Sequence, residues 1–498
     1  MTVLPNRREA LAAGRLAAIA GVGLGGLASS VPGSAAAYPQ RHVAVIASTL
    51  APDTVPRDVV VIATDGFSRA GDGGGATYRR VTVAPTHCGW FRSPDGSIWE
   101  LDQDIVSIRA MGAVGDGRAD DRAAVQAAID YIEARGGGTV LIPAGRFRLV
   151  MTAAPDRTGP IAIWMRSNVH LHGTDRKRSV LVLADDQRGP GTFGRIIASP
   201  NLSDATLTNF TLEANRNGQS GEQNATNGAA IMLGSAGAHV ERVQIDSLVV
   251  KDANGQGIQV VGHPNALGRD IVIRGNRVER SSFIGIQVSH FVGIIIEDND
   301  VTDCVDNGID VYGDNFLTQS TIVTSKQARI TNNRVRRCSS GVFLETVSEV
   351  DVTNNLFDNC LITGLHINRI HGEPSGIMIT GNRTDKTPIG ASMTGDFGGV
   401  SFLSNHFSGF TVAALQFGLN GEGNVSFVVA SGNVFDCRGS TCPVVFGCAP
   451  KGVLSWIQVT NNFIMGIPPR SQLFVNLFGT NNGVHVGGFL GVQTTFAA

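Results

Sequence analysis

Five short segments of similar sequence carry the residue types that acid–base chemistry needs. They read GIQVVGH, GIQVSHF, GIDVYGD, GVFLETV and GLHINRI, and each begins with a Gly followed by an apolar residue. Aligned on that pair, the alternation predicts strands whose apolar positions point inward. The opposite face then carries two columns, which are Gln259, Gln287, Asp310, Phe343 and His366, and beside them Val261, Ser289, Tyr312, Glu345 and Asn368. We expect this face to be exposed to solvent, so that Asp310→Asn should leave stability nearly unchanged.

Asp310 and Glu345 are two carboxylic acids on segments that follow one another in the chain. If these segments are neighbouring parallel strands, a strand spacing of about 4.8 Å and a two-residue rise of about 6.8 Å place the two β-carbons about 8 Å apart. Two carboxyl groups across a groove can hydrolyse a glycosidic bond, one protonating the leaving oxygen and the other activating water or attacking. The sequence leaves inverting and retaining outcomes open.

The same face also suits a lyase, which needs a base for the proton beside a uronic carboxylate and a cation to neutralise that carboxylate. His290, His366 or Tyr312 could be the base, and Arg369 the cation. Tyr312 and Phe343 offer flat faces on which a sugar can stack. We predict catalytic roles for Asp310, Glu345, Tyr312 and His366, and substrate contacts for His290, Arg369, Phe343 and Gln287.

The sequence gives no support for a metal or another cofactor. Cys437, Cys442 and Cys448 crowd one segment, but their spacing matches no zinc pattern and no His lies near them. We therefore predict no metal site and no cofactor, leave a calcium requirement open, and expect a disulfide within this segment.

An asparagine repeat predicts the architecture that positions these residues. Two positions after all but one of the repeated asparagines the sequence has an apolar residue, and short alternating runs precede most of them. The asparagines are Asn276, Asn299, Asn333, Asn355, Asn382, Asn405, Asn433 and Asn462, and all but one of their intervals lie between 22 and 29 residues. A unit of that length without helical periodicity predicts the coils of a parallel β-helix. We expect these turn asparagines to adopt left-handed backbone angles and to hydrogen-bond from coil to coil.

Upstream of the coils, the segment GAVGDGRADDRAAVQAAIDYIEARGGGTVLIPAGRF, Gly112 to Phe147, contains one predicted helix at 122–134 that would cap the solenoid. This segment resembles the entry segment of the pectate-lyase-like superfamily, which occurs in β-helical polysaccharide enzymes and phage tailspikes. The resemblance implies a right-handed parallel β-helix. It also implies structural roles in turns and at the helix cap for Asp116, Asp120 and Asp121.

The chain departs from several motifs of that superfamily. The DPH segment of alginate epimerases is absent, since Gln259 stands where an acid would be expected. The NTD, GHG and RIK signatures of polygalacturonases and the RxPxxR run of calcium pectate lyases are also absent. We therefore rank a uronan epimerase below a hydrolase or a lyase.

Charge and the N-terminus bound the partners and the location. The 498 residues include 40 Lys and Arg against 42 acidic residues, which argues against a nucleic-acid or anionic-membrane partner. Arg7 and Arg8, a weakly apolar run and the small residues Ala35 and Ala37 resemble a twin-arginine export signal. We expect a secreted or periplasmic protein with no membrane span after cleavage, because no other apolar run is long enough.

These observations predict three regions: a signal peptide at 1–37, a small β-rich region at 38–104, and the all-β solenoid with its capping helix at 105–498. The predicted function is an exported enzyme that cleaves a polysaccharide, as a glycoside hydrolase or a polysaccharide lyase. The alternative is a glycan-binding or tailspike-like surface protein without catalysis, using the same long face. We expect a monomer or a homotrimer.

Overall fold

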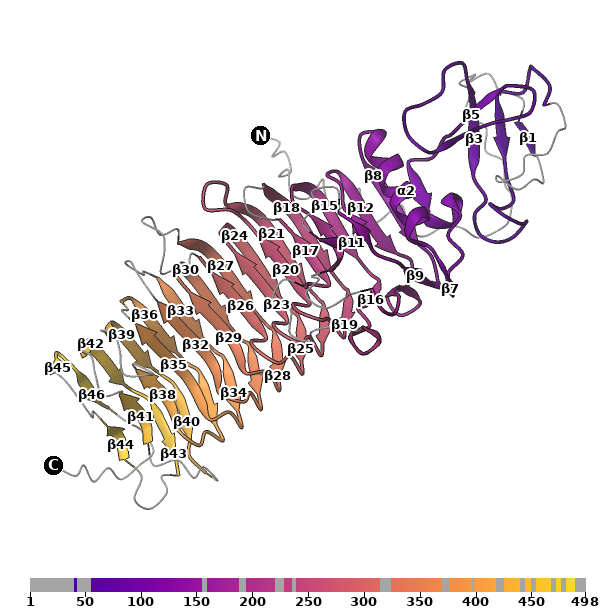
Figure 1. The fold of residues 1–498 in the computed structure, drawn as a ribbon. Helices are drawn as coiled ribbons and strands as arrows, with labels where there is room; N and C mark the ends of the chain where they lie inside the picture. Colours follow the sequence, from indigo (N-terminus) through magenta and orange to yellow (C-terminus); the bar gives the residue numbers. More distant parts are fainter. Residues whose placement is uncertain are drawn as a thin grey trace, which may run out of the picture. The chain divides into compact units, whose positions relative to one another are not determined.

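The structure is a computed structural model in which most of the chain forms one parallel β-helix (Figure 1). It describes residues 40–42, 55–154, 159–187, 194–219, 228–234, 239–313, 324–369, 376–395, 398–417, 425–438, 444–448, 454–466, 472–475 and 481–488. The predicted signal peptide and Cys442 lie outside the described residues. Among the described residues, no helix is long and apolar enough to cross a membrane.

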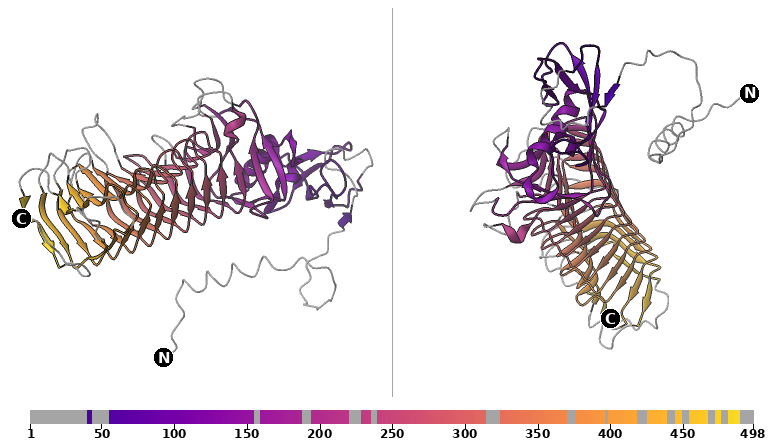
Figure 2. Two further views of the ribbon diagram at one scale, coloured as in Figure 1. Left: turned by 90° about the horizontal axis from the view of Figure 1, so that it is seen from below. Right: turned by 90° about the vertical axis from the view of Figure 1, so that its right-hand side faces the viewer.

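Three parallel sheets form the solenoid, and each coil adds one strand to each sheet (Figures 1 and 2). Sheet 1 consists of β10 (Thr152–Ala153), β11 (Pro160–Trp164), β14 (Arg195–Ser199), β17 (Ile231–Leu233), β20 (Ile258–Val261), β23 (Ile286–Ser289), β26 (Ile309–Tyr312), β29 (Ser340–Glu345), β32 (Thr363–Arg369), β35 (Ile389–Gly395), β38 (Ala413–Phe417), β41 (Val444–Cys448) and β44 (Gln472–Val475). The short β10 is antiparallel to β11, and the other strands of this sheet run parallel.

The other two sheets follow the same coil order. Sheet 2 consists of β6 (Ile105–Ser107), β8 (Gly138–Ile142), β12 (Val169–Gly173), β15 (Leu202–Thr208), β18 (Val240–Asp246), β21 (Gly268–Arg274), β24 (Phe291–Glu297), β27 (Ser325–Thr331), β30 (Val347–Thr353), β33 (Ile377–Thr380), β36 (Val400–Leu403), β39 (Val425–Ser431), β42 (Leu454–Thr460), β45 (Asn481–Asn482) and β46 (His485–Gly487). Sheet 3 consists of β7 (Asp116–Asp120), β9 (Gly145–Leu149), β13 (Ser179–Leu183), β16 (Thr211–Glu213), β19 (Val249–Lys251), β22 (Arg277–Glu279), β25 (Asp300–Thr302), β28 (Arg334–Arg336), β31 (Leu356–Asp358), β34 (Arg383–Asp385), β37 (His406–Ser408), β40 (Val434–Asp436) and β43 (Phe463–Met465).

The region before the solenoid contains a five-stranded sheet in the order β1-β2-β3-β5-β4. Its strands are β1 (Gln40–His42), β2 (Val61–Ala63), β3 (Thr77–Val81), β4 (Trp90–Arg92) and β5 (Ile98–Leu101). Two short 3-10 helices, η2 (Ile108–Met111) and η3 (Arg216–Gly218), complete the described elements together with the helix α2. The strand content agrees with the β-rich character predicted for 38–104.

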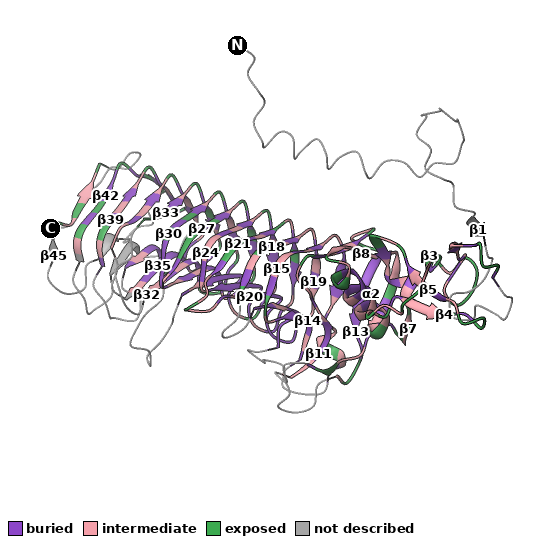
Figure 3. Cartoon of the chain, turned by 90° about the horizontal axis from the view of Figure 1, so that it is seen from above, coloured by how far each residue is buried: buried purple, intermediate pink, exposed green. Residues whose placement is uncertain are grey.

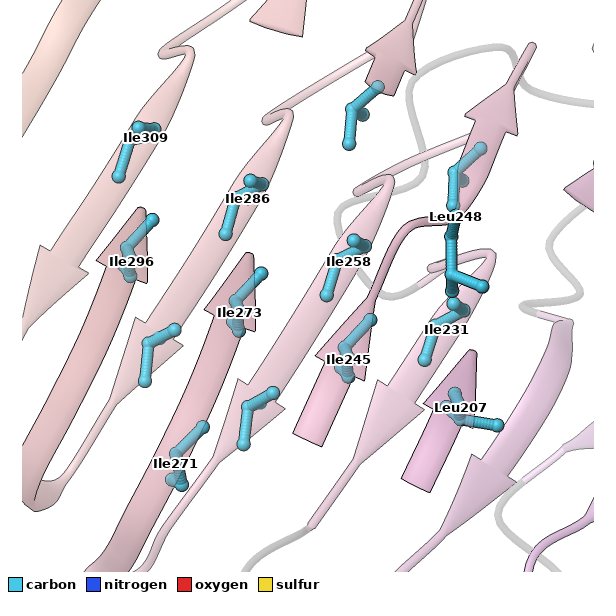
Figure 4. Close-up of a cluster of buried hydrophobic side chains, with 14 of the residues drawn as sticks. Leu207, Ile231, Ile245, Leu248, Ile258, Ile271, Ile273, Ile286, Ile296 and Ile309 are labelled. Atoms are coloured by element: carbon cyan, nitrogen blue, oxygen red, sulfur yellow. The ribbon is translucent and has the colours of Figure 1, made fainter. Parts of the chain in front are cut away.

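Columns of aliphatic side chains fill the interior of the solenoid (Figure 4). Ile258, Ile286 and Ile309 are paired in register along sheet 1 and are fully buried. Because strand side chains alternate between faces, many strands of sheets 2 and 3 contribute buried and more exposed residues in turn (Figure 3), whereas strands of sheet 1 such as β23 are buried on both faces. The predicted register, with the second residue of each GI, GV or GL pair pointing inward, is confirmed.

The asparagine column forms a continuous hydrogen-bonded ladder, as predicted. In Asn355, for example, Nδ2 donates to Asn382 Oδ1 at 2.9 Å and to the carbonyl of Ile330 at 2.8 Å. Asn355 Oδ1 accepts from both the backbone N–H and Nδ2 of Asn333, at 2.8 and 3.0 Å. The same pattern joins Asn276 to Asn462, and all of these asparagines are buried.

The expectation that these asparagines have left-handed backbone angles is wrong. The left-handed residue is the one before each of them: Gly275, Asp298, Asn332, Asn354, Gly381, Ser404, Gly432 and Asn461, with φ between 54° and 68°. This preceding residue makes the sharp turn. The ladder asparagine keeps negative φ, which leaves its backbone N–H directed at the next coil's carboxamide.

Helix α2 (Arg122–Ala134) has the predicted bounds. Val125, Ala128, Ile129 and Ile132 are buried, and the helix contacts β8, β11 and β12 of the first coils. Asp121 occupies the N-cap position, but its side chain makes no capping hydrogen bond. Its carboxylate instead accepts from the backbone of Gly115, so it holds the turn before the helix. The role of α2 as an end cap stays a prediction.

The cysteines divide as the repeat suggested. Cys304, Cys338 and Cys360 are free and buried in one column, five residues after their ladder asparagines. Cys437 is also a buried thiol. The expected disulfide of its segment therefore does not include Cys437, whose side chain packs in the core.

We expect Asn355→Ala to destabilise the fold by about 2 to 4 kcal/mol, because it removes four ladder hydrogen bonds and leaves buried donors and acceptors without partners. Denaturant unfolding followed by circular dichroism measures the change. Gln458→Ala, which removes an exposed amide from β42, is the control and should change stability by less than about 0.5 kcal/mol. Equal effects of the two substitutions would contradict a stabilising ladder.

Candidate functional site

Sheet 1 brings the predicted site residues together in the register that the sequence indicated. Asp310 of β26 pairs with Gln287 of β23 on one side and with Phe343 of β29 on the other. The next outward position pairs Tyr312 with Glu345. Asp310 and Glu345 therefore lie diagonally on neighbouring coils. His366 follows Phe343 in the first column.

The burial of this face differs from the expectation that it is an exposed surface. Asp310 is only 7% exposed, although Ile309 and Val311 on either side of it point into the interior. Gln259 and Gln287 in the same column are buried to the same extent, whereas Tyr312 and Glu345 are half-buried. Long polar side chains in one column pack on one another from coil to coil, and this contact removes water from the acid between them.

A chain of carboxamides fixes the orientation of Asp310. Gln287 Oε1 accepts from Gln256 Nε2 at 3.1 Å and from Gln259 Nε2 at 2.8 Å. Because its oxygen is engaged in this way, Gln287 turns its Nε2 to Asp310 Oδ2, at 3.1 Å. Asp310 Oδ1 has no hydrogen-bond partner in the part of the chain that the structure describes. When Asp310 is neutral, Oδ1 is thus the oxygen that carries the proton.

Burial raises the pKa values of the two acids into the neutral range. It raises the pKa of Asp310 to about 8, and the nearby charges of Glu345 and Asp306 add to that shift, while the hydrogen bond from Gln287 opposes it. Burial also raises the pKa of Glu345 to about 7, against the hydrogen bond that Asn368 Nδ2 donates to Glu345 Oε1 at 2.9 Å. The site therefore holds a protonated acid beside one that is close to half-ionised at neutral pH.

The aromatic residues lie beside these acids. The rings of Phe343 and His366 have centroids 4.9 Å apart, and His366 Nε2 lies 3.1 Å from Thr394 Oγ1. Burial lowers the pKa of His366 to about 4, so its ring is neutral at pH 7. His290 and Tyr312 form an edge contact with ring centroids 6.1 Å apart. The side chain of Arg369 lies outside the described residues.

Sequence reasoning missed two residues of this site. Asp306 lies in the turn before β26, where the strand alternation that revealed the other residues does not apply, and burial raises its pKa. Its position four residues before Asp310 was the available signal. Gln256 also precedes its strand, and only the three-dimensional contact with Gln287 identifies it.

Within the described ranges, no three His, Cys, Asp or Glu side chains are grouped so that they could hold a metal ion. The acids of the site instead have amide partners, Gln287 for Asp310 and Asn368 for Glu345. Hydrogen bonding and proton transfer are the chemistry that this arrangement offers.

Comparison with known sequences finds a family and several relatives. Residues 195–383 match the model of the right-handed beta helix region. Mannuronan C5-epimerase AlgE1 of Azotobacter vinelandii is 29% identical over 218 residues, which are 43% of this chain and 14% of that protein. Alginate lyase 7 of the same organism is 34% identical over 121 residues, 23% of this chain and 13% of that protein. The chain thus spans a small part of the length of these relatives.

Solved structures share the architecture. The A-module of the A. vinelandii mannuronan C-5 epimerase AlgE6 superposes with a TM-score of 0.53 at 19% identity, covering 78% of this chain and 100% of the module. A tailspike protein of E. coli bacteriophage HK620, in complex with a pentasaccharide, gives a TM-score of 0.53 at 15% identity and covers 76% of this chain and 70% of that one. At these identities the likeness concerns the fold.

The buried acid makes stability depend on pH, and we expect Asp310→Asn to reduce that dependence. The folded protein keeps the Asp310 proton up to a pKa of about 8, whereas the unfolded chain releases it near pH 4, so this residue lowers stability as pH rises between these values. The neutral amide has no such proton, and Asp310→Asn should be more stable than wild type at pH 9.

Thermal unfolding at pH 5 and pH 9 measures this difference. Asp358→Asn, an equal charge change on β31 of sheet 3, is the matched control and should retain the pH dependence of wild type. The sequence suggests that Asp310 is exposed and that Asp310→Asn leaves thermal stability nearly unchanged. The burial of Asp310 replaces that expectation. A wild-type pH dependence in Asp310→Asn would show that the acid is not buried.

Proposed function

We propose that this protein, a right-handed parallel β-helix of the pectate-lyase-like superfamily, is an enzyme that binds a polysaccharide along sheet 1 and transforms it by proton transfer at Asp310 and Glu345. The observation that carries the proposal is the diagonal pair of acids on neighbouring coils, both with pKa values near neutrality. Its fold is the one that the resemblance of Gly112 to Phe147 implied.

The protonation states give the two acids different tasks. At pH 7 Asp310 is mostly protonated and can donate from Oδ1, while a large fraction of Glu345 is ionised and can accept a proton. Paired acids whose environments separate their protonation states are what general acid–base catalysis requires. Neutral His366 can accept a proton as well, and Phe343 and Tyr312 can contact the sugar faces.

Two reaction classes use these groups in different ways. In hydrolysis, Asp310 protonates the glycosidic oxygen and Glu345 activates water or attacks the anomeric carbon. In proton abstraction next to a uronic carboxylate, Glu345 or His366 removes the proton and neutral Asp310 hydrogen-bonds to the substrate carboxylate, whose negative charge grows as the proton leaves. Elimination then gives a lyase, and return of a proton to the opposite face gives an epimerase.

Sequence similarity favours proton abstraction from a uronic acid polymer. Most of the relatives detected by sequence are named as mannuronan epimerases or as an alginate lyase, two activities that share this first step, although one is named as a plasmin- and fibronectin-binding protein. The missing DPH segment ranked the epimerase below the lyase, and these matches support keeping the epimerase as a candidate beside the lyase. Hydrolysis remains the second candidate, because two acids across a groove suffice for it.

A glycan-binding protein without catalysis is the alternative from another class. The likeness to a tailspike in complex with a pentasaccharide is compatible with it, since that likeness concerns the fold. A binding face gains nothing from desolvated acids, whose burial costs stability at neutral pH. The acids of sheet 1 therefore favour the enzyme. The oligomeric state, monomer or homotrimer, stays a prediction.

Incubation with alginate, polygalacturonate and neutral glycans separates these activities. Ultraviolet absorbance of unsaturated uronides indicates a lyase, new reducing ends without absorbance indicate a hydrolase, and exchange of the C5 proton with deuterated solvent without cleavage indicates an epimerase. We expect uronan substrates to react. Binding of these polymers with none of the three signals would refute the enzyme and support the binding protein.

On the substrate that reacts, Asp310→Asn and Glu345→Gln should each lower kcat by at least about 100-fold, because each removes a positioned proton donor or acceptor. Asp358→Asn on sheet 3 is the charge-matched control and should retain the wild-type rate. Steady-state kinetics on folded variants gives the comparison. Full turnover by both amide variants would exclude this pair as the active site.

Export by the twin-arginine route belongs to the proposal as well. A double substitution of Arg7→Lys and Arg8→Lys should leave precursor in the cytoplasm, because this route requires the arginine pair, whereas the wild type should yield a mature N-terminus near Tyr38. Cell fractionation and N-terminal sequencing measure both. Normal export of the double variant would refute the route.

A further inference from the structure

Sheet 2 contains a column of residues with left-handed backbone angles, one in almost every coil. We call it the left-handed column. It consists of Asp204, Arg242, Asp270, Gly293, Gln327, Glu349, Gly376, Gly399, Phe427 and Trp456, with φ between 51° and 80°. Each of them directly precedes an inward residue, and these inward residues are paired in register from Ala205 to Ile457. Side chains of the column thus lie on successive coils.

In the first half of the column the side chains are polar and pair with one another. Arg242 donates two hydrogen bonds of 2.7 Å to Asp204, and Gln327 Nε2 donates to Glu349 Oε2 at 3.1 Å. The column then changes character. Gly376 and Gly399 supply no side chain, and the next two coils carry Phe427 and Trp456.

Phe427 and Trp456 form an exposed aromatic pair. Their side chains are 61% and 63% exposed, and their ring planes are parallel to within 2° with centroids 6.5 Å apart. Both have left-handed angles, with φ of 51° and 55°, which cost a bulky residue about 1 to 2 kcal/mol. The pair therefore bears backbone strain without the burial that usually stabilises an aromatic residue. Folding does not explain why this column has aromatic residues where glycine would serve.

Among the described residues, the strands that surround the pair carry no charged side chain. The strands β33, β36, β39 and β42 read IMIT, VSFL, VSFVVAS and LSWIQVT, whereas the strands of sheet 2 from β15 to β30 carry Lys, Arg, Asp or Glu. In β42, Ser455 directly precedes Trp456, and Gln458 follows it by two residues. An apolar ring face beside hydroxyl and amide groups matches a pyranose, which has C–H groups on its faces and hydroxyls at its edge.

We propose that Phe427 and Trp456 form a second glycan-binding site, on sheet 2, which holds a polysaccharide by stacking pyranose rings on the aromatic pair. The coils are about 4.8 Å apart, close to the length of one sugar unit in a chain, so neighbouring coils can contact neighbouring sugars. The site is separate from Asp310 and Glu345, which lie on sheet 1. Only the class of polymer rests on the proposed function.

A second copy of this chain is a less suitable occupant of the surface around the pair. The exposed apolar residues of this surface are Met378, Phe427 and Trp456 among the described residues, and burying all three would cover roughly 300 to 400 Å². Each partner in a stable interface contributes about 800 Å². Serines and Gln458 separate these apolar residues, and such a mixture suits a sugar better than a protein core.

Glycine variants test the site without damaging the fold, because Gly376 and Gly399 already occupy equivalent positions. We expect Phe427→Gly and Trp456→Gly each to weaken binding of alginate by about tenfold, and the double variant to weaken it further. Binding is measured by affinity electrophoresis in the Asp310→Asn background, so that no polymer is consumed. The melting temperature should stay within about 2 °C of that background, since glycine relieves the left-handed strain. Phe463→Gly on sheet 3, also an exposed aromatic residue, should not affect binding.

Polygalacturonate and a neutral galactomannan serve as further probes, and weakened binding of any of the three polymers by the double variant supports the site. Unchanged binding of all three would overturn it. A wild-type oligomer that dissociates in the double variant, measured by sedimentation, would also overturn it in favour of self-association. If no polymer is transformed but binding still depends on the pair, the proposed function fails and this inference stands. If turnover depends on Asp310 but binding does not depend on Phe427 and Trp456, the proposed function stands and this inference fails.

Discussion

Each coil can satisfy its backbone and bury its side chains only against the coil before it and the coil after it, and the rest of the structure depends on this stacking. The asparagine ladder enforces the register. Asn355 accepts two hydrogen bonds from Asn333 and donates to both Asn382 and Ile330, so a slip of one residue in a single coil breaks contacts on both of its sides. The interior columns add the same restriction, because a slip would move an isoleucine from the core to the outer face.

The same stacking creates the candidate site. Side chains in an outward column cannot avoid one another, and a hydrogen-bonded chain of three carboxamides therefore ends on Asp310 through Gln287. An acid in such a column loses water without being inside the solenoid. Its desolvation is a local cost, because a solenoid distributes its stability over neighbouring coils and an unfavourable residue weakens only the coils it contacts. A long ladder elsewhere in the same coils can hold the register while Asp310 stays protonated near pH 7.

Much of the fold and of the candidate site could be predicted from the sequence, because residues that repeat at a regular interval stack on one another in neighbouring coils. The asparagine intervals gave the coils, the Gly and apolar pairs gave the register of Asp310 and Glu345, and the pattern at 122–134 gave helix α2. The burial of Asp310 could not be predicted, because it depends on which rotamers its neighbours adopt. The left-handed angle was assigned one residue too late, since Asn332 and Asn333 are alike in sequence and only the ladder geometry tells them apart. Gln256 and Asp306 lie in turns, where periodicity gives no information.

Repetition and its interruption distinguish the two kinds of column. The residue type of an inner column repeats because the same volume must be filled in every coil. Ile258, Ile286 and Ile309 are an example. An outward column is free of that requirement, so a change of residue type along it reflects what the surface contacts. Sheet 1 changes from carboxamides to an acid, and sheet 2 changes from paired charges to an aromatic pair. Because coils and sugar units have similar spacing, position along a column corresponds to position along a polymer chain. A solenoid can therefore carry catalytic residues on one sheet and polymer-binding residues on another.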